Sequence, residues 1–323
     1  MNSGSRQLLV TGASGFLGSS IVNLASKDGW RIRALSRRPQ IQDGAVEVLS
    51  GNVVDPAFMR KAAEGVNAIV HAAGLAHVFG RQARDSAEFD ASNETGTANV
   101  IDAALECGIP HVVLVSSVSV YGRYSGQQCD ETTSCQPQGP YATSKWRGEL
   151  RAAERMAKGH GSLTILRLAT IYGEGDRGNV ARLIAALDRR YFVWIGSGEN
   201  RKSLIYKDDA ARACLRALKR IEPGVETFNV VAQTATMREI VEAICTALRR
   251  RVPRIKLSPS ALSAACAVSR VIGDPMHVSG SLQKLIRDDV YSGAKFETAF
   301  DFRPAISLSE GIRREVESLR AVR

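Results

Sequence analysis

Short apolar runs alternate with amphipathic helical segments through the first half of the chain. The apolar runs have the length of strands buried in a parallel sheet, and they cover residues 8–10, 30–36, 45–49, 68–70, 112–115 and 163–166. Helical patterns lie between these runs, at residues 15–28, from 55 onward, at 89–107 and at 141–158. Strands that alternate with helices of this length predict an α/β protein with a doubly wound parallel sheet.

Beyond Thr170 the alternation becomes less regular. Glycines and short strands there separate helical patterns at residues 180–189, 208–219, 237–250 and 307–319. One of these helices is expected to begin at a capping box formed by Thr236 and Glu239. The pattern predicts a first domain over residues 1–170 and a smaller lobe over 171–323, with some segments of the lobe returning to the sheet. No linker-like stretch separates them, so we do not expect them to fold independently.

A glycine-rich turn joins the first predicted strand to the first predicted helix. Gly12 permits the tight turn, Gly15 removes a side chain where a pyrophosphate must approach, and Gly18 lets the helix pack close to the strand. The start of the helix adds unpaired N–H groups and the positive end of the helix dipole. This context predicts a Rossmann-type dinucleotide site. Its candidate residues in the turn are Gly12, Ser14, Gly15, Phe16, Leu17 and Gly18.

The end of the second predicted strand bears on which dinucleotide binds. An acidic residue at that position would bind the 2′-hydroxyl of the adenosine ribose and would favour NAD. The position is occupied by Ser36, and Arg37 and Arg38 follow, which suit a 2′-phosphate. We therefore favour NADP over NAD as the cofactor. The alternative is that both arginines simply face solvent.

Three residues form a candidate catalytic group. Tyr141 and Lys145 lie one turn apart on one face of a predicted helix, and Ser117 follows a buried strand at the carboxyl edge of the sheet, where ligands of open α/β sheets bind. Hydride transfer between a carbinol and nicotinamide requires a proton to move at the oxygen. Tyr141 is the expected acid/base, Lys145 is expected to lower its pKa, and Ser117 is expected to hydrogen-bond the substrate oxygen. The alternative is a surface tyrosine and lysine on an amphipathic helix.

Together these motifs resemble the extended short-chain dehydrogenases/reductases of the NAD(P)-dependent nucleotide-sugar epimerase/dehydratase family. The resemblance covers nearly the whole chain. Besides the residues above, the matching segments are residues 71–74, 93–97, 117–122, 166–173, 196–198, 205–210 and 302–311. The resemblance implies a Rossmann domain that binds the cofactor, a C-terminal lobe that mainly binds substrate, and a homodimer formed through two of the helices.

The resemblance also implies roles for further residues. Asn52 and Val53 would flank the adenine ring, and Ala72, Ala73 and Gly74 would line the cofactor cleft, where Tyr141 and Lys145 also contact the cofactor. The implied substrate-binding residues are Ser119, Thr170, Tyr172, Asn179, Val180, Arg201 and Lys202. The family has an arginine at the position of Lys202 that grips the substrate diphosphate, and either Lys202 or its neighbour Arg201 could do so here.

Departures from the family pattern narrow the expected reaction. The 4,6-dehydratases carry two acidic residues after the catalytic serine, whereas Val118 and Ser119 follow Ser117 here, which disfavours a dehydratase. The expected function is NAD(P)-dependent chemistry at C4 of a nucleotide-linked hexose, by a 4-epimerase with a 4-keto intermediate or by a 4-keto-sugar reductase. Two alternatives stay open: an NADPH-dependent reductase of a non-sugar carbonyl, and a non-catalytic dinucleotide-binding regulatory protein.

The charge of the chain adds expectations about its partners. The 323 residues include 43 Lys and Arg against 33 Asp and Glu, a net charge of +10 with histidine neutral, which suggests an anionic partner. A dinucleotide and a nucleotide-sugar substrate would use only a few of these charges. Basic residues gather at 249–254, but without the aromatic residues typical of nucleic-acid binding. We therefore expect a solvated helix end there, and neither nucleic acid nor a membrane as a partner.

Composition and cysteine usage bear on class and compartment. The chain is 44% apolar and 24% charged, which is typical of a folded globular protein and excludes a disordered one. Its 6 cysteines include no C-x-x-C pair, so we expect reduced thiols, no metal site and a cytoplasmic location. The residues before the first strand are too few for a signal peptide, and the apolar stretch at 261–272 is too short to span a membrane.

Overall fold

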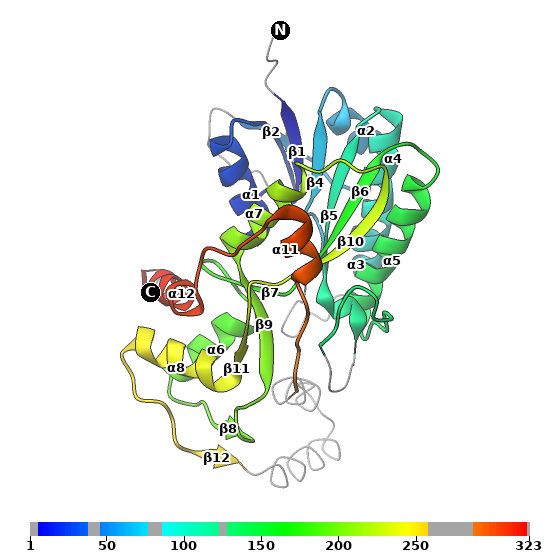
Figure 1. Cartoon of the computed structure of the whole chain (residues 1–323). Coiled ribbons are helices and arrows are strands. Elements are labelled where there is room, and N and C mark those ends of the chain that lie inside the picture. Colours follow the sequence, from blue (N-terminus) through cyan, green and yellow to red (C-terminus); the bar gives the residue numbers. More distant parts are fainter. Residues whose placement is uncertain (1–5, 38–45, 77–85, 123–127, 258–286, 322–323) are drawn as a thin grey trace.

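The computed structural model describes residues 6–37, 46–76, 86–122, 128–257 and 287–321. They form a domain built on a seven-stranded parallel sheet, with a smaller lobe beyond one edge of that sheet (Figure 1). The predicted α/β class with a doubly wound parallel sheet is therefore confirmed. None of the helices in the described ranges has both the length and the apolar character required to cross a membrane.

The strands of the central sheet lie in the order β10-β6-β5-β4-β1-β2-β3, and all neighbouring pairs are parallel. These strands are β1 (Gln7–Thr11), β2 (Arg31–Ser36), β3 (Val46–Ser50), β4 (Ala68–His71), β5 (His111–Ser117), β6 (Ser162–Leu168) and β10 (Gly224–Val230). The direction of winding reverses at β1 and β4. In open α/β sheets, ligands bind beyond the carboxyl ends of the strands at such a point.

Helices cover both faces of the sheet and bury two separate apolar cores. The helices of the first face are α1 (Phe16–Lys27), α7 (Lys207–Ala217) and α11 (Ala294–Phe300). Those of the second face are α2 (Pro56–Ala63), α4 (Gly96–Glu106) and α5 (Pro140–Met156). Because both faces are covered, β1, β4, β5 and β6 are buried along almost their whole length. This burial explains why their sequences read as apolar runs.

The long helix predicted at residues 89–107 is interrupted in the structure. The chain instead forms α3 (Ser86–Asp90), a wide π-type turn at Ala91–Thr95, and then α4. Such a turn is frequent at functional sites, and here it carries the buried side chain of Asn93. The 3.6-residue periodicity does not reveal the turn, because the buried positions Phe89, Asn93 and Thr97 keep a helical spacing through it.

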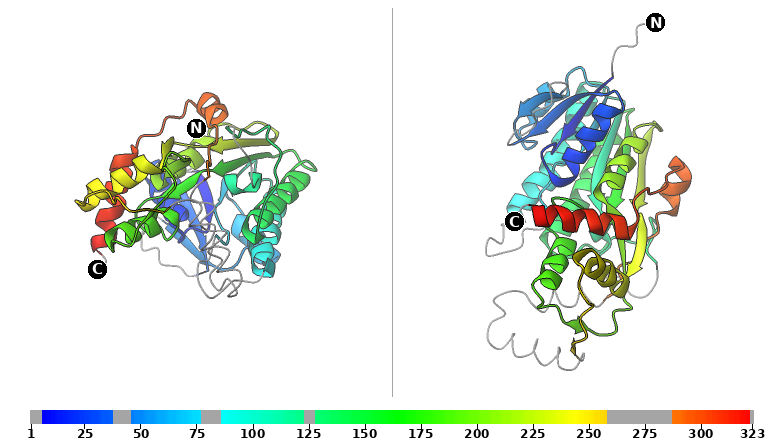
Figure 2. Two further views of the ribbon diagram at one scale, coloured as in Figure 1. Left: turned by 90° about the horizontal axis from the view of Figure 1, so that it is seen from below. Right: turned by 90° about the vertical axis from the view of Figure 1, so that its left-hand side faces the viewer.

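The smaller lobe contains a three-stranded sheet with helices packed around it. Its elements are β7 (Thr170–Tyr172), α6 (Asn179–Asp188), β8 (Trp194–Ile195), β9 (Arg201–Tyr206), β11 (Gln233–Thr236), α8 (Met237–Leu248), β12 (Lys256–Leu257) and α12 (Leu308–Ala321). The predicted capping box at Thr236 and Glu239 is confirmed at the start of α8. Figure 2 shows α12 lying across the junction between the central sheet and the rest of the lobe.

A carboxyl group is buried where α12 crosses this junction. Glu315 is fully buried, and one of its oxygens accepts a hydrogen bond from the backbone N–H of Gly173 at 3.0 Å. Its other oxygen has no hydrogen-bond partner among the described residues. Burial, with the charge of nearby Asp176 acting in the same direction, raises the pKa of Glu315 to about 9.

Glu315 should therefore make stability depend on pH. Its carboxyl group ionises near pH 4 in the unfolded chain and only near pH 9 in the folded chain, so the folded state binds one more proton between these values and stability falls as pH rises. We expect Glu315→Gln to raise the melting temperature relative to wild type more at pH 8.5 than at pH 5. Thermal unfolding followed by circular dichroism at both pH values measures this difference. An equal effect at both would contradict the assignment.

Candidate active site

The glycine loop lies between the end of β1 and the start of α1. Gly12 has a φ of +70°, and a Cβ there would come within 2.7 Å of the backbone of Ala73. A Cβ at Gly18 would come within 2.0 Å of the carbonyl oxygen of Gly12, so α1 can approach the loop only without a side chain. Helix α1 begins after Gly15 with no side-chain cap and no acidic residue in its first turn. The loop can therefore hold the pyrophosphate of a dinucleotide.

The end of β2 lies beside this loop. The hydroxyl groups of Ser14 and Ser36 form a hydrogen bond that joins the loop to β2. Ser36 is buried, and Arg37, the next residue, is exposed. Arg38 lies outside the described residues. Ser36 rather than an acidic residue ends β2, and the residue that follows it is an exposed cation.

The other predicted cofactor residues differ in how far their side chains are exposed. Leu17 and Val53 are buried in the two apolar cores, which leaves little of either side chain to contact a ligand. The remaining ones are exposed or half-buried, namely Phe16, Asn52, Ala72, Ala73 and Gly74. Gly74 links the cofactor loop to the catalytic residues, since a Cβ there would come within 2.8 Å of the ammonium nitrogen of Lys145.

Ser117, Tyr141 and Lys145 meet at the carboxyl edge of the sheet. Ser117 ends β5, and the other two residues lie one turn apart on α5. The hydroxyl groups of Ser117 and Tyr141 are hydrogen-bonded. The Lys145 ammonium group donates to the carbonyl oxygen of Val115 at 3.1 Å. The structure thus brings together the three residues that the sequence assigns to proton transfer, beside the loop that can hold the cofactor.

Burial controls the protonation of this group. Burial raises the pKa of Tyr141 above its ordinary value, and the hydrogen bond from Ser117 opposes the rise. Desolvation is the larger of these two effects, so the net shift of the Tyr141 pKa is upward. The expected lowering of this pKa by Lys145 stays a prediction. Burial also lowers the pKa of Lys145 to about 8, against the charge of Glu149, which raises it. Lys145 is therefore protonated below about pH 8.

A buried ion pair beneath the site was not anticipated from the sequence. Glu149 and Arg167 are 3% and 5% exposed, and their closest approach, between an Oε and an Nη atom, is 2.7 Å. The Ser116 hydroxyl donates to Glu149, and Arg167 donates to the Tyr121 hydroxyl at 2.9 Å. The Arg167 guanidinium also lies over the Tyr121 ring, 4.8 Å from its centre.

This ion pair holds the two elements that carry the catalytic residues. Glu149 lies one turn after Lys145 on α5, and its partner Ser116 directly precedes Ser117 on β5. Two sequence signals could have revealed it: a glutamate four residues after Lys145, and an arginine inside the apolar run of β6. A charged residue within a strand buried on both faces requires a charged partner.

Asn93, in the π-type turn, fixes the other side of the site. Its amide group pairs with the backbone of Leu75, accepting from the N–H at 2.8 Å and donating to the carbonyl at 3.0 Å. It also donates to the hydroxyl of Ser144, the neighbour of Lys145, at 2.9 Å. Asn93 therefore connects the chain after β4 to α5 and positions both against the cofactor loop.

The predicted substrate-binding residues do not all reach the catalytic edge. Ser119 lies there, with a buried hydroxyl oxygen that has no hydrogen-bond partner among the described residues. Thr170 is exposed two residues beyond Leu168, which is the register partner of Ser117. Tyr172 is fully buried and hydrogen-bonded to Gln233. The predicted contact of Tyr172 with substrate is therefore corrected, because its side chain belongs to the core of the smaller lobe.

Two further candidates lie at the start of α6. Asn179, its first residue, is exposed, whereas Val180 is 5% exposed and packs into the core of the lobe. Asp176 accepts hydrogen bonds from the backbone N–H groups of Gly178 and Ala181 and so holds this end of the helix. Asn179 can face a ligand, and Val180 can contribute little more than its backbone.

Both candidate cations for the substrate diphosphate have acidic neighbours. The Lys202 ammonium group lies 2.5 Å from a carboxylate oxygen of Asp289. The Arg201 guanidinium lies 3.5 Å from Asp288. The Lys202 side chain is 13% exposed and that of Arg201 is 55% exposed. Successive residues of β9 point to opposite faces of the sheet, so only one of the two can face a given ligand.

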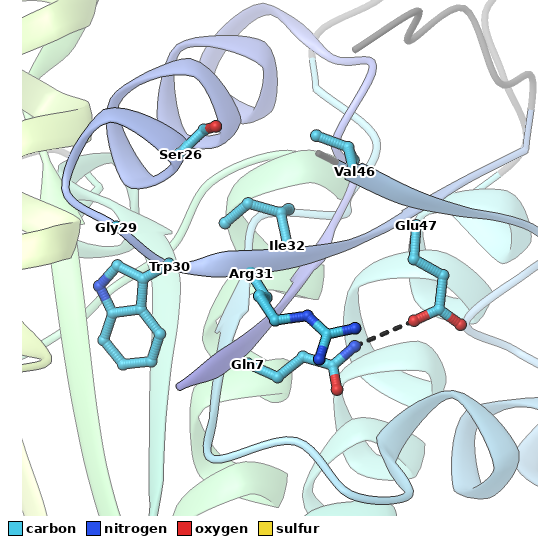
Figure 3. Close-up of a pocket in the computed structure, with 8 residues that line it drawn as sticks. All are labelled: Gln7, Ser26, Gly29, Trp30, Arg31, Ile32, Val46 and Glu47. Atoms are coloured by element: carbon cyan, nitrogen blue, oxygen red, sulfur yellow. Dashed lines mark hydrogen bonds between the residues drawn. The ribbon is translucent and has the colours of Figure 1, made fainter. Parts of the chain in front are cut away.

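A hollow elsewhere on the central domain lies far from these residues. Figure 3 shows it at the amino ends of β1 and β2, with a volume of about 480 Å³. Its lining residues are Gln7, Ser26, Gly29, Trp30, Arg31, Ile32, Val46 and Glu47. The strands are parallel, so this hollow is at the opposite edge of the sheet from Ser117, and we do not assign the active site to it. In the described ranges, no cluster of His, Cys, Asp or Glu could hold a metal ion.

Comparison with known proteins identifies a family model that matches residues 8–231, that of the NAD dependent epimerase/dehydratase family. The N-acetyl-alpha-D-glucosaminyl-diphospho-ditrans,octacis-undecaprenol 4-epimerase of Escherichia coli O157:H7 is 28% identical over 323 residues, which cover 96% of this chain and 94% of that protein. The 2-alkyl-3-oxoalkanoate reductase of Stenotrophomonas maltophilia is 29% identical over 331 residues, which cover 95% of this chain and 98% of that protein.

Solved structures show the same fold. The UDP-glucuronic acid 4-epimerase from Bacillus cereus in complex with NAD superimposes with a TM-score of 0.78, over 98% of this chain and 97% of that one. The two sequences are 19% identical. At this level of identity the likeness concerns the fold.

Proposed function

The chain belongs to the NAD dependent epimerase/dehydratase family and is an enzyme, and we propose that it acts at C4 of a nucleotide-linked hexose. It does so as a 4-epimerase with a 4-keto intermediate or as a 4-keto-sugar reductase. The observation that carries the proposal is the hydrogen bond between Ser117 and Tyr141, with Lys145 beside it, next to the glycine loop between β1 and α1. The Escherichia coli relative, named as a 4-epimerase of a diphosphate-linked sugar, supports the choice of C4.

In the proposed mechanism the residues of the chain orient the sugar and move its proton. The nicotinamide cofactor, when bound, supplies the hydride acceptor and donor. The Ser117 hydroxyl holds the oxygen at C4. The Tyr141 phenolic oxygen takes the proton of the C4 hydroxyl when C4 is oxidised and returns it when the ketone is reduced. Lys145 carries a positive charge below pH 8, which favours the phenolate that this step needs.

A substrate panel tests the proposed function. UDP-, GDP- and dTDP-hexoses and their 4-keto derivatives are incubated with NAD(H) or NADP(H), and products are followed by NMR. Interconversion of C4 epimers with a cofactor retained through purification indicates an epimerase. Stoichiometric consumption of NADPH with a 4-keto sugar indicates a reductase. Failure to convert any sugar nucleotide, in the presence of either cofactor, would contradict the proposal.

We propose NADP as the preferred cofactor, because the exposed Arg37 follows Ser36 where NAD-binding sites carry an acid. Arg37→Ala should weaken NADPH binding about 10–100-fold, the effect of losing a hydrogen bond between charged groups, and should change NADH binding little. Fluorescence titration measures the dissociation constants of NADPH and NADH. Arg31→Ala, an exposed arginine at the far end of β2, is the matched control. Equal weakening of NADH and NADPH by Arg37→Ala would contradict the preference.

We propose that Lys202 rather than Arg201 grips the diphosphate, since it occupies the position of the family's arginine and is held in place by Asp289. Lys202→Met should raise KM for the sugar nucleotide about tenfold, the effect of one charged contact, with kcat changed less than about twofold. Arg201→Met is the matched variant. A larger rise in KM for Arg201→Met would transfer the role to Arg201. Steady-state kinetics with varied sugar nucleotide measures both.

One alternative function has support from a relative. The Stenotrophomonas maltophilia protein is named as a reductase of 2-alkyl-3-oxoalkanoates, which are not sugars. A reductase of a non-sugar ketone would use Ser117, Tyr141 and Lys145 in the same way but would not need Lys202. Oxidation of NADPH by 3-oxo acids, unaffected by Lys202→Met, would favour this alternative over the sugar substrate.

A homodimer is part of the proposal, by the family resemblance. Leu150 on α5 is 50% exposed in the single chain, as expected for a helix that packs against a second copy. Sedimentation of the purified protein measures its oligomeric state.

A further inference from the structure

The smaller lobe ends in a surface that we call the basic tip, formed by residues 189–191 and 249–257. Two contacts bring these separate segments together. Lys256 pairs with Trp194 in the β8–β12 ladder, and the guanidinium of Arg250 lies 3.0 Å from a carboxylate oxygen of Asp188. Figure 1 shows β8 and β12 at the foot of the lobe, at the end farthest from the central sheet.

The basic tip gathers 7 of the 43 Lys and Arg residues of the chain. Its cations are Arg189, Arg190, Arg249, Arg250, Arg251, Arg254 and Lys256, and it contains no acidic residue. Arg250 is half-buried and paired with Asp188, while the other six cations are exposed. None of these six forms an ion pair with a described residue. The basic tip is therefore a surface of one sign of charge.

Large apolar side chains are exposed among these cations. Tyr191, Val252, Ile255 and Leu257 are four of the seven large apolar residues that stand out from the described surface. Ile255, the most exposed of them, has 68% of its surface open to solvent. Exposed apolar surface that is rimmed by polar or charged residues marks a site of interaction with a protein or a membrane.

Helix ends alone do not account for the basic tip. Helices α6 and α8 both end there, and cations stabilise the last turn of a helix. However, Arg251, Arg254 and Lys256 lie beyond the last turn of α8. In addition, Arg190 and Arg249 have φ values of +63° and +56°, a conformation that glycine or asparagine adopts at lower cost after a helix. The chain thus carries arginine at two positions where its backbone is strained.

We propose that the basic tip binds the surface of an anionic membrane, and that the enzyme acts there without spanning the bilayer. The six exposed cations would contact lipid phosphates and anionic headgroups, while Ile255, Leu257 and Val252 would enter the boundary between headgroups and acyl chains. Alternating basic and aliphatic residues suit such an interface, whereas single-stranded nucleic acid needs a series of stacking aromatic rings, and the exposed ring of the tip is Tyr191 alone. On this proposal the basic tip is more than the solvated helix end that the sequence predicts.

Vesicle binding by the full chain tests the proposal. The protein should sediment with vesicles of phosphatidylglycerol and phosphatidylcholine, remain in solution with phosphatidylcholine alone, and be released by about 0.5 M salt. The variant R251Q/R254Q/K256Q removes three cations of the tip. At about fivefold per cation near an anionic surface, it should lower vesicle affinity by about a hundredfold.

The matched control is K27Q/K61Q/K219Q, which removes the same charge from exposed lysines of α1, α2 and the end of α7. It should lower affinity less than about threefold. A second variant, I255S/L257S, should weaken binding to the anionic vesicles while leaving its salt dependence unchanged. Both variants of the tip should keep the turnover of soluble substrates. Equal losses for the two charge variants would overturn the proposal, as would binding of single-stranded DNA that competes with the vesicles.

Discussion

Tyr141→Phe is expected to lower kcat by about 10²–10⁴-fold, the range typical of a lost general acid–base group. The phenylalanine keeps the ring and its edge-on packing against Phe89, whose centre is 6.4 Å away, but removes the oxygen that takes and returns the proton. It also leaves the Ser117 hydroxyl without its partner on α5. Turnover of the accepted substrate, measured at saturating cofactor, gives the effect.

Cofactor binding and folding should survive this substitution, because the Tyr141 ring is only half-buried and lies outside both apolar cores. Tyr191→Phe, which removes a hydroxyl from an exposed tyrosine of the smaller lobe, is the matched control and should leave kcat unchanged. If Tyr141→Phe retains the turnover of wild type, the proton must move through another group and the assignment of the catalytic residues is wrong.

Glu149→Ala is expected to lower the free energy of unfolding by about 3–5 kcal/mol, because it leaves the Arg167 guanidinium buried without a counter-charge. The Ser116 hydroxyl also loses its acceptor. Urea unfolding followed by circular dichroism measures the loss. The double variant Glu149→Leu/Arg167→Met replaces the ion pair by apolar groups of similar volume, so it should recover most of the stability. If the double variant is as unstable as Glu149→Ala, the loss of stability comes from lost packing rather than from an uncompensated buried charge.

The same residue should also affect the pH dependence of activity. Glu149 raises the pKa of Lys145 against the effect of burial, which otherwise lowers it to about 8. Glu149→Gln keeps the size of the side chain and removes its charge, so Lys145 should lose its proton at a lower pH. The alkaline limb of the profile of kcat/KM should then begin at lower pH than in wild type.

The elements of the fold follow from local sequence more completely than the site does. Buried parallel strands and the glycine loop leave strong signals, because β1, β4, β5 and β6 are buried and mostly apolar and because Gly12 and Gly18 lie where a Cβ would collide with backbone. The π-type turn at Asn93 leaves none, since it adds one residue to a helix without changing the apolar face on either side. Its amide bonds to Leu75 and Ser144 depend on segments far apart in the chain.

In the candidate site, too, some features follow from local sequence and others depend on packing between distant elements. Residue type and order are enough to select Ser117, Tyr141 and Lys145 as candidates. The serine follows an apolar strand, and the tyrosine and lysine lie one turn apart on the next long helix. Exposure, by contrast, depends on packing between distant elements. Tyr172 looks like a ligand contact in the sequence, but the neighbouring α12 covers it, with Gly311 so close that a Cβ there would lie 2.6 Å from its hydroxyl oxygen. The basic tip likewise depends on the pairing of β8 with β12 and on the ion pair between Arg250 and Asp188.

The position of β10 in the central sheet affects how the chain can fold as it is synthesised. All seven residues of β6 are buried, with β5 on one edge and β10 on the other. β10 is synthesised only after four elements of the smaller lobe and one helix of the central domain. These are β7, α6, β8 and β9, followed by α7. During that interval β6 has an unpaired edge of backbone N–H and C=O groups, a template for wrong strand pairing. A nascent chain that stalls after residue 170 keeps this edge open, so protection from aggregation during synthesis depends on prompt elongation through the lobe.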